Sequence, residues 1–88
     1  MKTIVASVGH GGLNRTDDVR LVQELLNRHM QLPQLPLVVD GVMSTRTIAA
    51  IEAFQRRVLN IHRPDGRIQP GDPTMVALTR QTEQTPTP

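Results

Sequence analysis

Hydrophobic residues recur at three- and four-residue steps in two long stretches of the chain, and this periodicity predicts two amphipathic helices. The first runs from about Asp17 to Met30, and its apolar positions are Val19, Val22, Leu25, Leu26 and Met30. The second runs from Ser44 or Thr45 to about Asn60, and its apolar positions are Ile48, Ile51, Phe54 and Val58. We predict that these two apolar stripes pack against each other and form the centre of the core.

Shorter elements are predicted on either side of this pair. The segment Lys2 to Val8 contains β-branched residues and predicts a short strand that ends at the glycine-rich loop 9–12. Asp72-Pro73 is a strong helix start, and we expect a last helix that ends near Arg80 and buries Met75, Val76 and Leu78. The fold class predicted is mainly α, a small three-helix bundle with a short N-terminal β-strand.

Two Asp-Gly pairs, Asp40-Gly41 and Asp65-Gly66, predict tight turns about 25 residues apart, because Asp accepts a nearby backbone N–H and Gly adopts a positive φ easily. The repetition suggests a helix-turn unit used twice. Before the first turn, Leu37 to Val39 is expected to form a short strand, with Leu37 and Val39 on one face and Val38 on the other. Asn14 and Thr16 are expected to cap the first helix.

Composition limits the classes of function. A chain of 88 residues without cysteine allows one domain, here residues 1–80, held by packing rather than by disulfides. The polar, Thr/Pro-rich residues 81–88 predict a disordered tail or linker. The net charge of +2 favours no partner, and a single Phe without Trp or Tyr leaves little for stacking on bases or sugars, so we expect no nucleic-acid ligand.

Groups that could carry catalysis do not converge in any motif. Asp40 and Asp65 both precede glycine in turns, where structural hydrogen bonding explains them better than a glycosidase carboxylate pair would. The three histidines have no metal-ligand spacing and are expected at the surface, so we predict no metal and no cofactor. Gln23 and Gln55 each lie beside an apolar stripe, where a buried amide could tie a loop to its helix.

Three segments together resemble the peptidoglycan-binding domain family of small three-helix cell-wall modules. The central one, V-D-G-x-x-x-x-x-T-x-x-A-I-x-x-F-Q, begins at Val39 and ends at Gln55. The first helix contributes Asp18-Val19, Val22-Gln23, Leu25-Leu26 and Asn27, and the closing part contributes Pro64-Asp65-Gly66, Thr74 and Leu78. The likeness covers roughly residues 17 to 79. It departs from the family at Met43-Ser44, where members commonly have Phe-Gly; Met can fill the same gap and Ser can cap the helix.

The resemblance implies a non-catalytic module that binds bacterial peptidoglycan and targets an attached wall-acting domain, a hydrolase or an effector, to it. It also implies a shallow groove near the central turn, between the first two helices. Without aromatic rings, recognition should use hydrogen bonds and charge, and the expected ligand-binding residues are Gln23, Asp40, Gly41, Arg46, Thr47, Gln55 and Arg67. Arg46 or Arg67 would meet stem-peptide carboxylates.

An alternative is a protein-interaction or delivery adaptor of a phage or a secretion-system effector, built on the same fold. The N-terminus lacks the apolar run of a signal peptide, and no stretch approaches membrane-spanning length. We therefore expect no membrane partner, and we expect the protein to act at the cell wall or in the periplasm after delivery by another route. We also expect a monomer.

Overall fold

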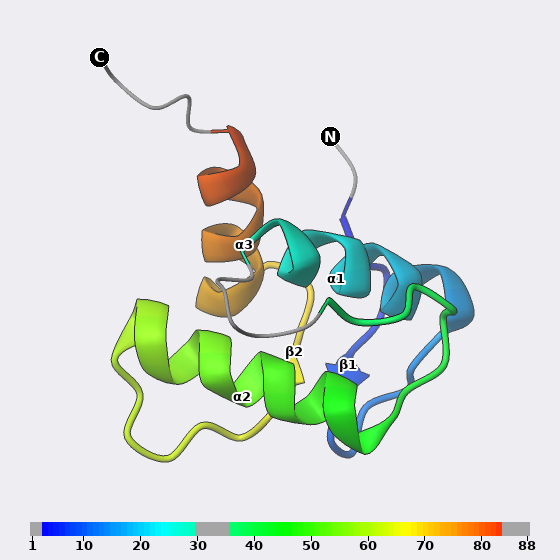
Figure 1. Cartoon of the computed structure of the whole chain (residues 1–88), viewed down its shortest axis with the longest axis horizontal. Helices are drawn as coiled ribbons and strands as arrows, with labels where there is room; N and C mark the ends of the chain where they lie inside the picture. The colour runs from blue at the N-terminus through cyan, green and yellow to red at the C-terminus, as the bar shows by residue number, and fades with distance from the viewer. Residues whose placement is uncertain (1–2, 30–35, 84–88) are drawn as a thin grey trace.

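The computed structural model describes residues 3–29 and 36–83 and contains three helices and two very short strands (Figure 1). The helices are α1 (Thr16–Arg28), α2 (Thr45–Leu59) and α3 (Pro73–Glu83). The strands β1 (Val8–Gly9) and β2 (Arg67–Ile68) pair antiparallel, with Val8 opposite Ile68 and Gly9 opposite Arg67. The predicted mainly α fold with three helices is confirmed.

The core contains both predicted stripes. Val19, Val22, Leu25 and Leu26 of α1 are buried, as are Ile51 and Phe54 of α2, whereas Ile48 and Val58 at the ends of the α2 stripe are half-buried. Segments outside these helices complete the core with Ile4, Val8, Leu37, Ile68, Met75 and Leu78. Val76 was expected to contribute an apolar contact; this prediction is wrong, because its side chain is 44% exposed on the outer face of α3.

The N-terminal segment is a strand only at its end. Asp18 of α1 accepts hydrogen bonds from Val5 N and Ala6 N, both at 3.0 Å, so a helix side chain takes the backbone donors that a strand neighbour would use. The predicted strand from Lys2 to Val8 is therefore reduced to Val8–Gly9 within the described residues. Lys2 lies outside them.

The connector before the first turn is not a strand either. Leu37 is buried in the core, and the Asn27 side chain pairs with its backbone: Leu37 N donates to Asn27 Oδ1 at 2.7 Å, and Asn27 Nδ2 donates to Leu37 O at 3.0 Å. Val39, expected on the same face as Leu37, is instead 37% exposed. Residues 30–35, which include the predicted helix end at Met30, lie outside the described part.

Helix ends follow the predicted caps at two of the three N-termini. Ser44 caps α2 by accepting from Thr47 N at 3.2 Å, and Asp72 Oδ1 accepts from Met75 N at 2.9 Å at the start of α3. At α1 the N-cap residue is Arg15, and it makes no side-chain cap, so the expected capping by Asn14 and Thr16 is wrong. α3 continues three residues past the predicted end at Arg80.

His29 joins the C-terminal end of α1 to the rest of the bundle and is half-buried, contrary to the predicted surface position. Its Nε2 lies 3.0 Å from Leu78 O of α3, and its ring packs on Phe54 with centroids 5.2 Å apart. Arg57 donates to the His29 carbonyl at 3.0 Å. The three helices are therefore connected by polar bonds at this end as well as by apolar packing.

Two valine-to-alanine changes test the core directly, because both sites are helical and lose the same atoms. Val22→Ala, at a fully buried position, should lower the free energy of unfolding by about 2 kcal/mol. Val76→Ala, at the exposed position, should change it by less than about 0.5 kcal/mol. Urea denaturation followed by circular dichroism measures both, and equal losses would contradict the packing described above.

Candidate functional site

Gln23 of α1 holds the first Asp-Gly turn from inside the protein. Its side chain is 1% exposed, and Oε1 accepts from Asp40 N at 3.1 Å and from Gly41 N at 2.9 Å. Nε2 lies within 3.2 Å of three acceptors, which are Asp40 Oδ1, Val42 O and Thr47 Oγ1. One amide thus joins α1 to the turn and to the first residues of α2.

Gln55 of α2 repeats this arrangement at the second turn. Its Oε1 accepts from Gly66 N at 3.1 Å, and Nε2 lies within 3.2 Å of Asp65 Oδ1, Arg67 O and Thr74 Oγ1. Its side chain is 2% exposed. We call these two networks the Gln clamps, the first centred on Gln23 and the second on Gln55. The two Asp-Gly pairs suggested that a helix-turn unit is used twice, and the two Gln clamps are these units.

The turn residues satisfy the geometry that the clamps need. Gly41 and Gly66 have φ of +74° and +67°, as predicted for glycine in these turns, and a Cβ on Gly41 would lie only 2.6 Å from Thr16 Cγ2. Asp40 Oδ1 also accepts from Val42 N at 2.9 Å, and Asp65 Oδ1 from Arg67 N at 3.1 Å. Each carboxylate therefore closes its own turn while it meets the glutamine.

Hydrogen bonds to the charged form lower the pKa of both aspartates. For Asp40, the backbone N–H of Val42 contributes most and the Gln23 amide comes next. For Asp65, the N–H of Arg67 is the largest cause, partly opposed by burial and reinforced by the Gln55 amide. Both groups are therefore carboxylates at neutral pH.

The predicted ligand-binding residues fall into two groups. Gln23, Asp40, Gly41 and Thr47 meet in the first clamp, with Arg46 exposed beside them, whereas Gln55 and Arg67 belong to the second. Along α2, Thr47 and Gln55 are about 12 Å apart at 1.5 Å per residue. The second Asp-Gly pair places Arg67 in the second turn, but the sequence does not show that Gln23 reaches the first turn and Gln55 the second.

Burial separates these residues by role. The amides of Gln23 and Gln55 and the hydroxyl of Thr47 are buried and hydrogen bonded within the protein, so they have no free group for a ligand while the turns are closed. This supports the structural alternative considered for the glutamines, in which they tie loops to helices. Asp40 and Arg46 reach the surface, and Arg67 is half-buried.

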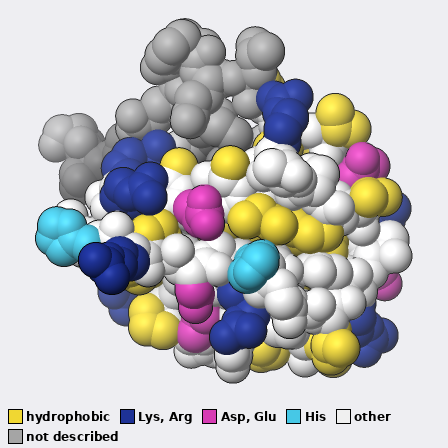
Figure 2. Space-filling model, turned by 90° about the horizontal axis from the view of Figure 1, so that it is seen from below, with side chains coloured by type: hydrophobic (Ala, Val, Ile, Leu, Met, Phe, Trp, Pro, Cys, Tyr) yellow, Lys and Arg dark blue, Asp and Glu magenta, His cyan; other side chains and the backbone are white. Residues whose placement is uncertain are grey.

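Exposed valines around the first turn were missed as candidate contacts. Val38 is 70% exposed and Val42 is 60% exposed, so apolar side chains lie on both sides of Asp40. The run V-V-D-G-V was a usable signal, because Val38 was expected on the face opposite Leu37 and Val42 follows the turn before the helix begins. Figure 2 shows that hydrophobic side chains also come together at the surface on the underside of the molecule.

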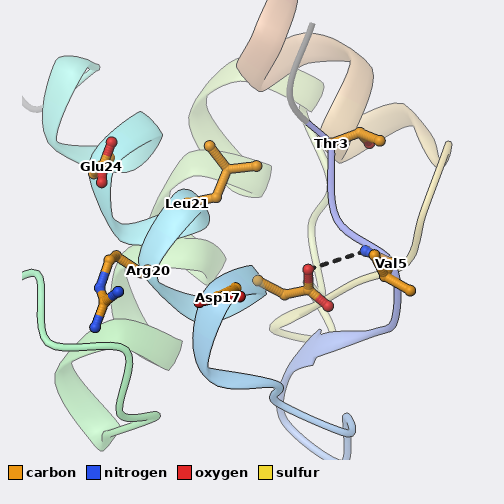
Figure 3. A pocket seen from close by; sticks show the side chains of 7 residues that line it. Thr3, Val5, Asp17, Arg20, Leu21 and Glu24 are labelled. Atoms are coloured by element: carbon orange, nitrogen blue, oxygen red, sulfur yellow. Dashed lines mark hydrogen bonds between the residues drawn. The ribbon is translucent and has the colours of Figure 1, made fainter.

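A hollow of about 390 Å³ lies elsewhere, between the N-terminal segment and α1 (Figure 3). Its lining residues are Thr3, Val5, Asp17, Asp18, Arg20, Leu21 and Glu24. None of them was predicted to bind a ligand. Both oxygens of Asp18 are used by the backbone of the N-terminal segment, so the charged groups left at the hollow are Asp17, Arg20 and Glu24.

Other classes of site have no counterpart in the described part of the chain. Residues 3–29 and 36–83 contain no group of three or more His, Cys, Asp or Glu side chains that could hold a metal ion. Within the same ranges, no helix is both long enough and apolar enough to cross a bilayer.

Removing the first clamp should destabilise the fold. Gln23→Met keeps the approximate volume of the side chain but leaves the buried N–H of Gly41 and the N–H of Asp40 without their acceptor, so the free energy of unfolding should fall by about 2 to 4 kcal/mol. Gln69→Met is the matched control, because Gln69 is exposed. Chemical denaturation compares the two, and similar small losses would show that the clamp contributes little.

Acid should weaken both turns. In the unfolded chain both aspartates have their ordinary pKa of 3.8, and in the folded protein their pKa is lower. The two carboxylates therefore stabilise the folded state fully above pH 3.8. This stabilisation is lost as the pH falls through the lower pKa of the folded state. Asp40→Asn and Asp65→Asn should each make the unfolding free energy less dependent on pH between about pH 5 and about pH 2. Urea titrations across this range would contradict the assignment if the variants kept the wild-type slope.

Comparison with known proteins agrees with this geometry. No curated protein and no solved structure matches the chain. One family model does match, over residues 15–70, and this span contains α1, α2 and both Asp-Gly turns. Because the match covers more than half of the chain, the protein belongs to the family described as "Putative peptidoglycan binding domain".

Proposed function

We propose that this protein is a non-catalytic module that binds bacterial cell-wall peptidoglycan and holds an attached wall-acting domain at the polymer. The observation that carries the proposal is the family match over residues 15–70, which contain the first Gln clamp and, of the second, Gln55 with its Asp-Gly turn. A tethered catalytic domain meets its insoluble substrate at a high effective concentration, so the module needs affinity for the wall but no chemistry of its own.

The first turn is the part of the surface best suited to bind the polymer. The buried Gln23 amide donates to Asp40 Oδ1 from inside the protein. The Asp40 carboxylate is exposed and can accept hydrogen bonds from N–H or O–H groups of a ligand. The guanidinium of Arg46, exposed in the first turn of α2, can pair with a carboxylate. Val38 and Val42 add apolar contacts on either side, which suit the methyl groups of acetamido and alanyl units.

Recognition by aromatic stacking is not available to the protein in this fold. Its single Phe is 2% exposed and packs against His29, and the sequence has neither Trp nor Tyr. Hydrogen bonds, charge and small apolar contacts must therefore supply the affinity. Such a surface favours the peptide part of the polymer, which carries amides and carboxylates, over the flat faces of its sugars.

Sedimentation with purified insoluble peptidoglycan tests the proposal. The wild-type protein should pellet with the polymer at moderate salt, and Arg46→Ala should lower the association constant about tenfold, which corresponds to a charged contact of about 1.4 kcal/mol. Arg80→Ala, an exposed arginine in α3, is the control and should bind like the wild type.

Two results would contradict the proposal. A wild-type protein that stays in the supernatant under all salt conditions has no affinity for the wall. Equal losses in the Arg46→Ala and Arg80→Ala variants would show that attraction depends on overall positive charge rather than on the first turn.

A further inference from the structure

Arg67 is half-buried, and its side chain has no hydrogen-bond acceptor among the described residues. Its Nε atom is buried without a partner, although the backbone N–H and C=O of the same residue are bonded in the second clamp. Burying a donor without an acceptor costs free energy, and the cost is larger for a charged group. The guanidinium of Arg67 is therefore partly buried without an internal hydrogen bond that would compensate for the cost.

The side chain of Arg67 reaches the glycine-rich loop at residues 9–12. Arg67 lies opposite Gly9 in the two-stranded sheet, and a Cβ on Gly11 would be 3.4 Å from Arg67 Nη1. Gly11 itself is exposed. The terminal nitrogens of Arg67 are not buried, unlike Nε, so a ligand can approach them beside Gly11.

The loop is held rigidly but leaves one donor free. Gly9 N donates to Asn14 Oδ1, His10 N donates to Gly66 O, and Gly12 N donates to Gly9 O. Asn14 Nδ2 donates back to the carbonyls of Gly9 and Gly12. Among these loop residues, Gly11 is the one whose N–H has no acceptor within the described part of the chain, and the Cβ position of the same residue faces Arg67 Nη1.

We propose that the terminal nitrogens of Arg67 and the N–H of Gly11 form a binding site for a single carboxylate, separate from the first turn. A guanidinium matches the planar carboxylate, and the ligand's charge offsets the cost of partly burying the cation. The inference rests on the proposed function in one respect: it assigns the carboxylate to a peptide end of the wall polymer.

Acidic groups near Arg67 affect whether a carboxylate or a phosphate binds better at this site. Asp65 lies two residues before Arg67 and keeps its charge, and a Cβ on Gly66 would be 3.2 Å from Glu52 Oε2. This local negative charge opposes any anion, and the opposition is about twice as large for a dianionic phosphate as for a monoanion. The site is thus expected to take the carboxyl end of a peptide rather than a phosphate-rich polymer.

An NMR titration of the labelled protein tests the site. N-acetyl-alanine, which carries a carboxylate, should shift the Gly11 amide and the Arg67 Nε–H resonances saturably, and N-acetyl-alaninamide, its neutral counterpart, should not. Arg67→Met should weaken binding of N-acetyl-alanine at least about tenfold. Arg63→Met, which removes an exposed arginine from the neighbouring connector, should leave it unchanged.

A second variant and a second anion complete the NMR test. If Arg67→Met does not fold, Arg67→Lys keeps the charge and removes the planar fork, and it should still weaken binding. Inorganic phosphate that shifts the same resonances more strongly than N-acetyl-alanine would overturn the carboxylate assignment. No response of Gly11 to either anion would overturn the site itself.

Sedimentation with peptidoglycan separates this inference from the proposed function. Wild-type protein that pellets with the polymer but shows no response at Gly11 overturns the carboxylate site and leaves the function in place. Protein that binds N-acetyl-alanine at Gly11 and Arg67 but never pellets overturns the wall-binding function and supports the site alone.

Discussion

The fold depends on burying two side-chain amides. A buried amide is costly unless its donor and acceptor atoms are all paired, and in this protein the partners of each amide come from an Asp-Gly turn and from the threonine that follows it. The cost of leaving an amide unpaired therefore fixes the conformation of each turn. A domain with so few large apolar residues gains from this a rigidity that packing alone would not give.

The two Gln clamps also connect the helices in series. The first joins α1 to the start of α2, and the second joins α2 to β2 and the start of α3. Each turn consequently faces the solvent from a fixed position, with its carboxylate anchored from inside the protein. For a binding module this is useful, because a preorganised surface loses little conformational entropy when it meets an extended polymer.

Periodicity was sufficient to predict the parts of the fold that depend on local pattern. The stripes of α1 and α2 and the caps at Ser44 and Asp72 are where the sequence placed them, since helix period and capping act over a few residues. Features set by distant partners were harder to predict. Asn14 looked like a cap but instead bonds the glycine loop, and Val5 looked like a strand residue but bonds to Asp18.

The candidate site, too, has some features that the local sequence predicts and others that depend on distant partners. The resemblance identified Gln23, Asp40, Gly41 and Thr47, and the structure brings them together. Burial of the two glutamines agrees with the prediction that their amides tie loops to helices, but the sequence did not show that Val38 and Val42 are exposed, because exposure depends on which side of the turn α1 covers. Nor could it reveal the pairing of Arg67 with the glycine loop, which requires the antiparallel contact of β1 with β2.

Amide hydrogen exchange at Gly41 and Gly66 tests the central claim most directly. Glycines in tight turns ordinarily exchange fast, but each of these donates to a buried glutamine oxygen. Both amides should therefore exchange as slowly as the interior amides of α1 and α2. Exchange as fast as that of the exposed Gly71, which has no such partner in the described structure, would show that the clamps do not hold the turns.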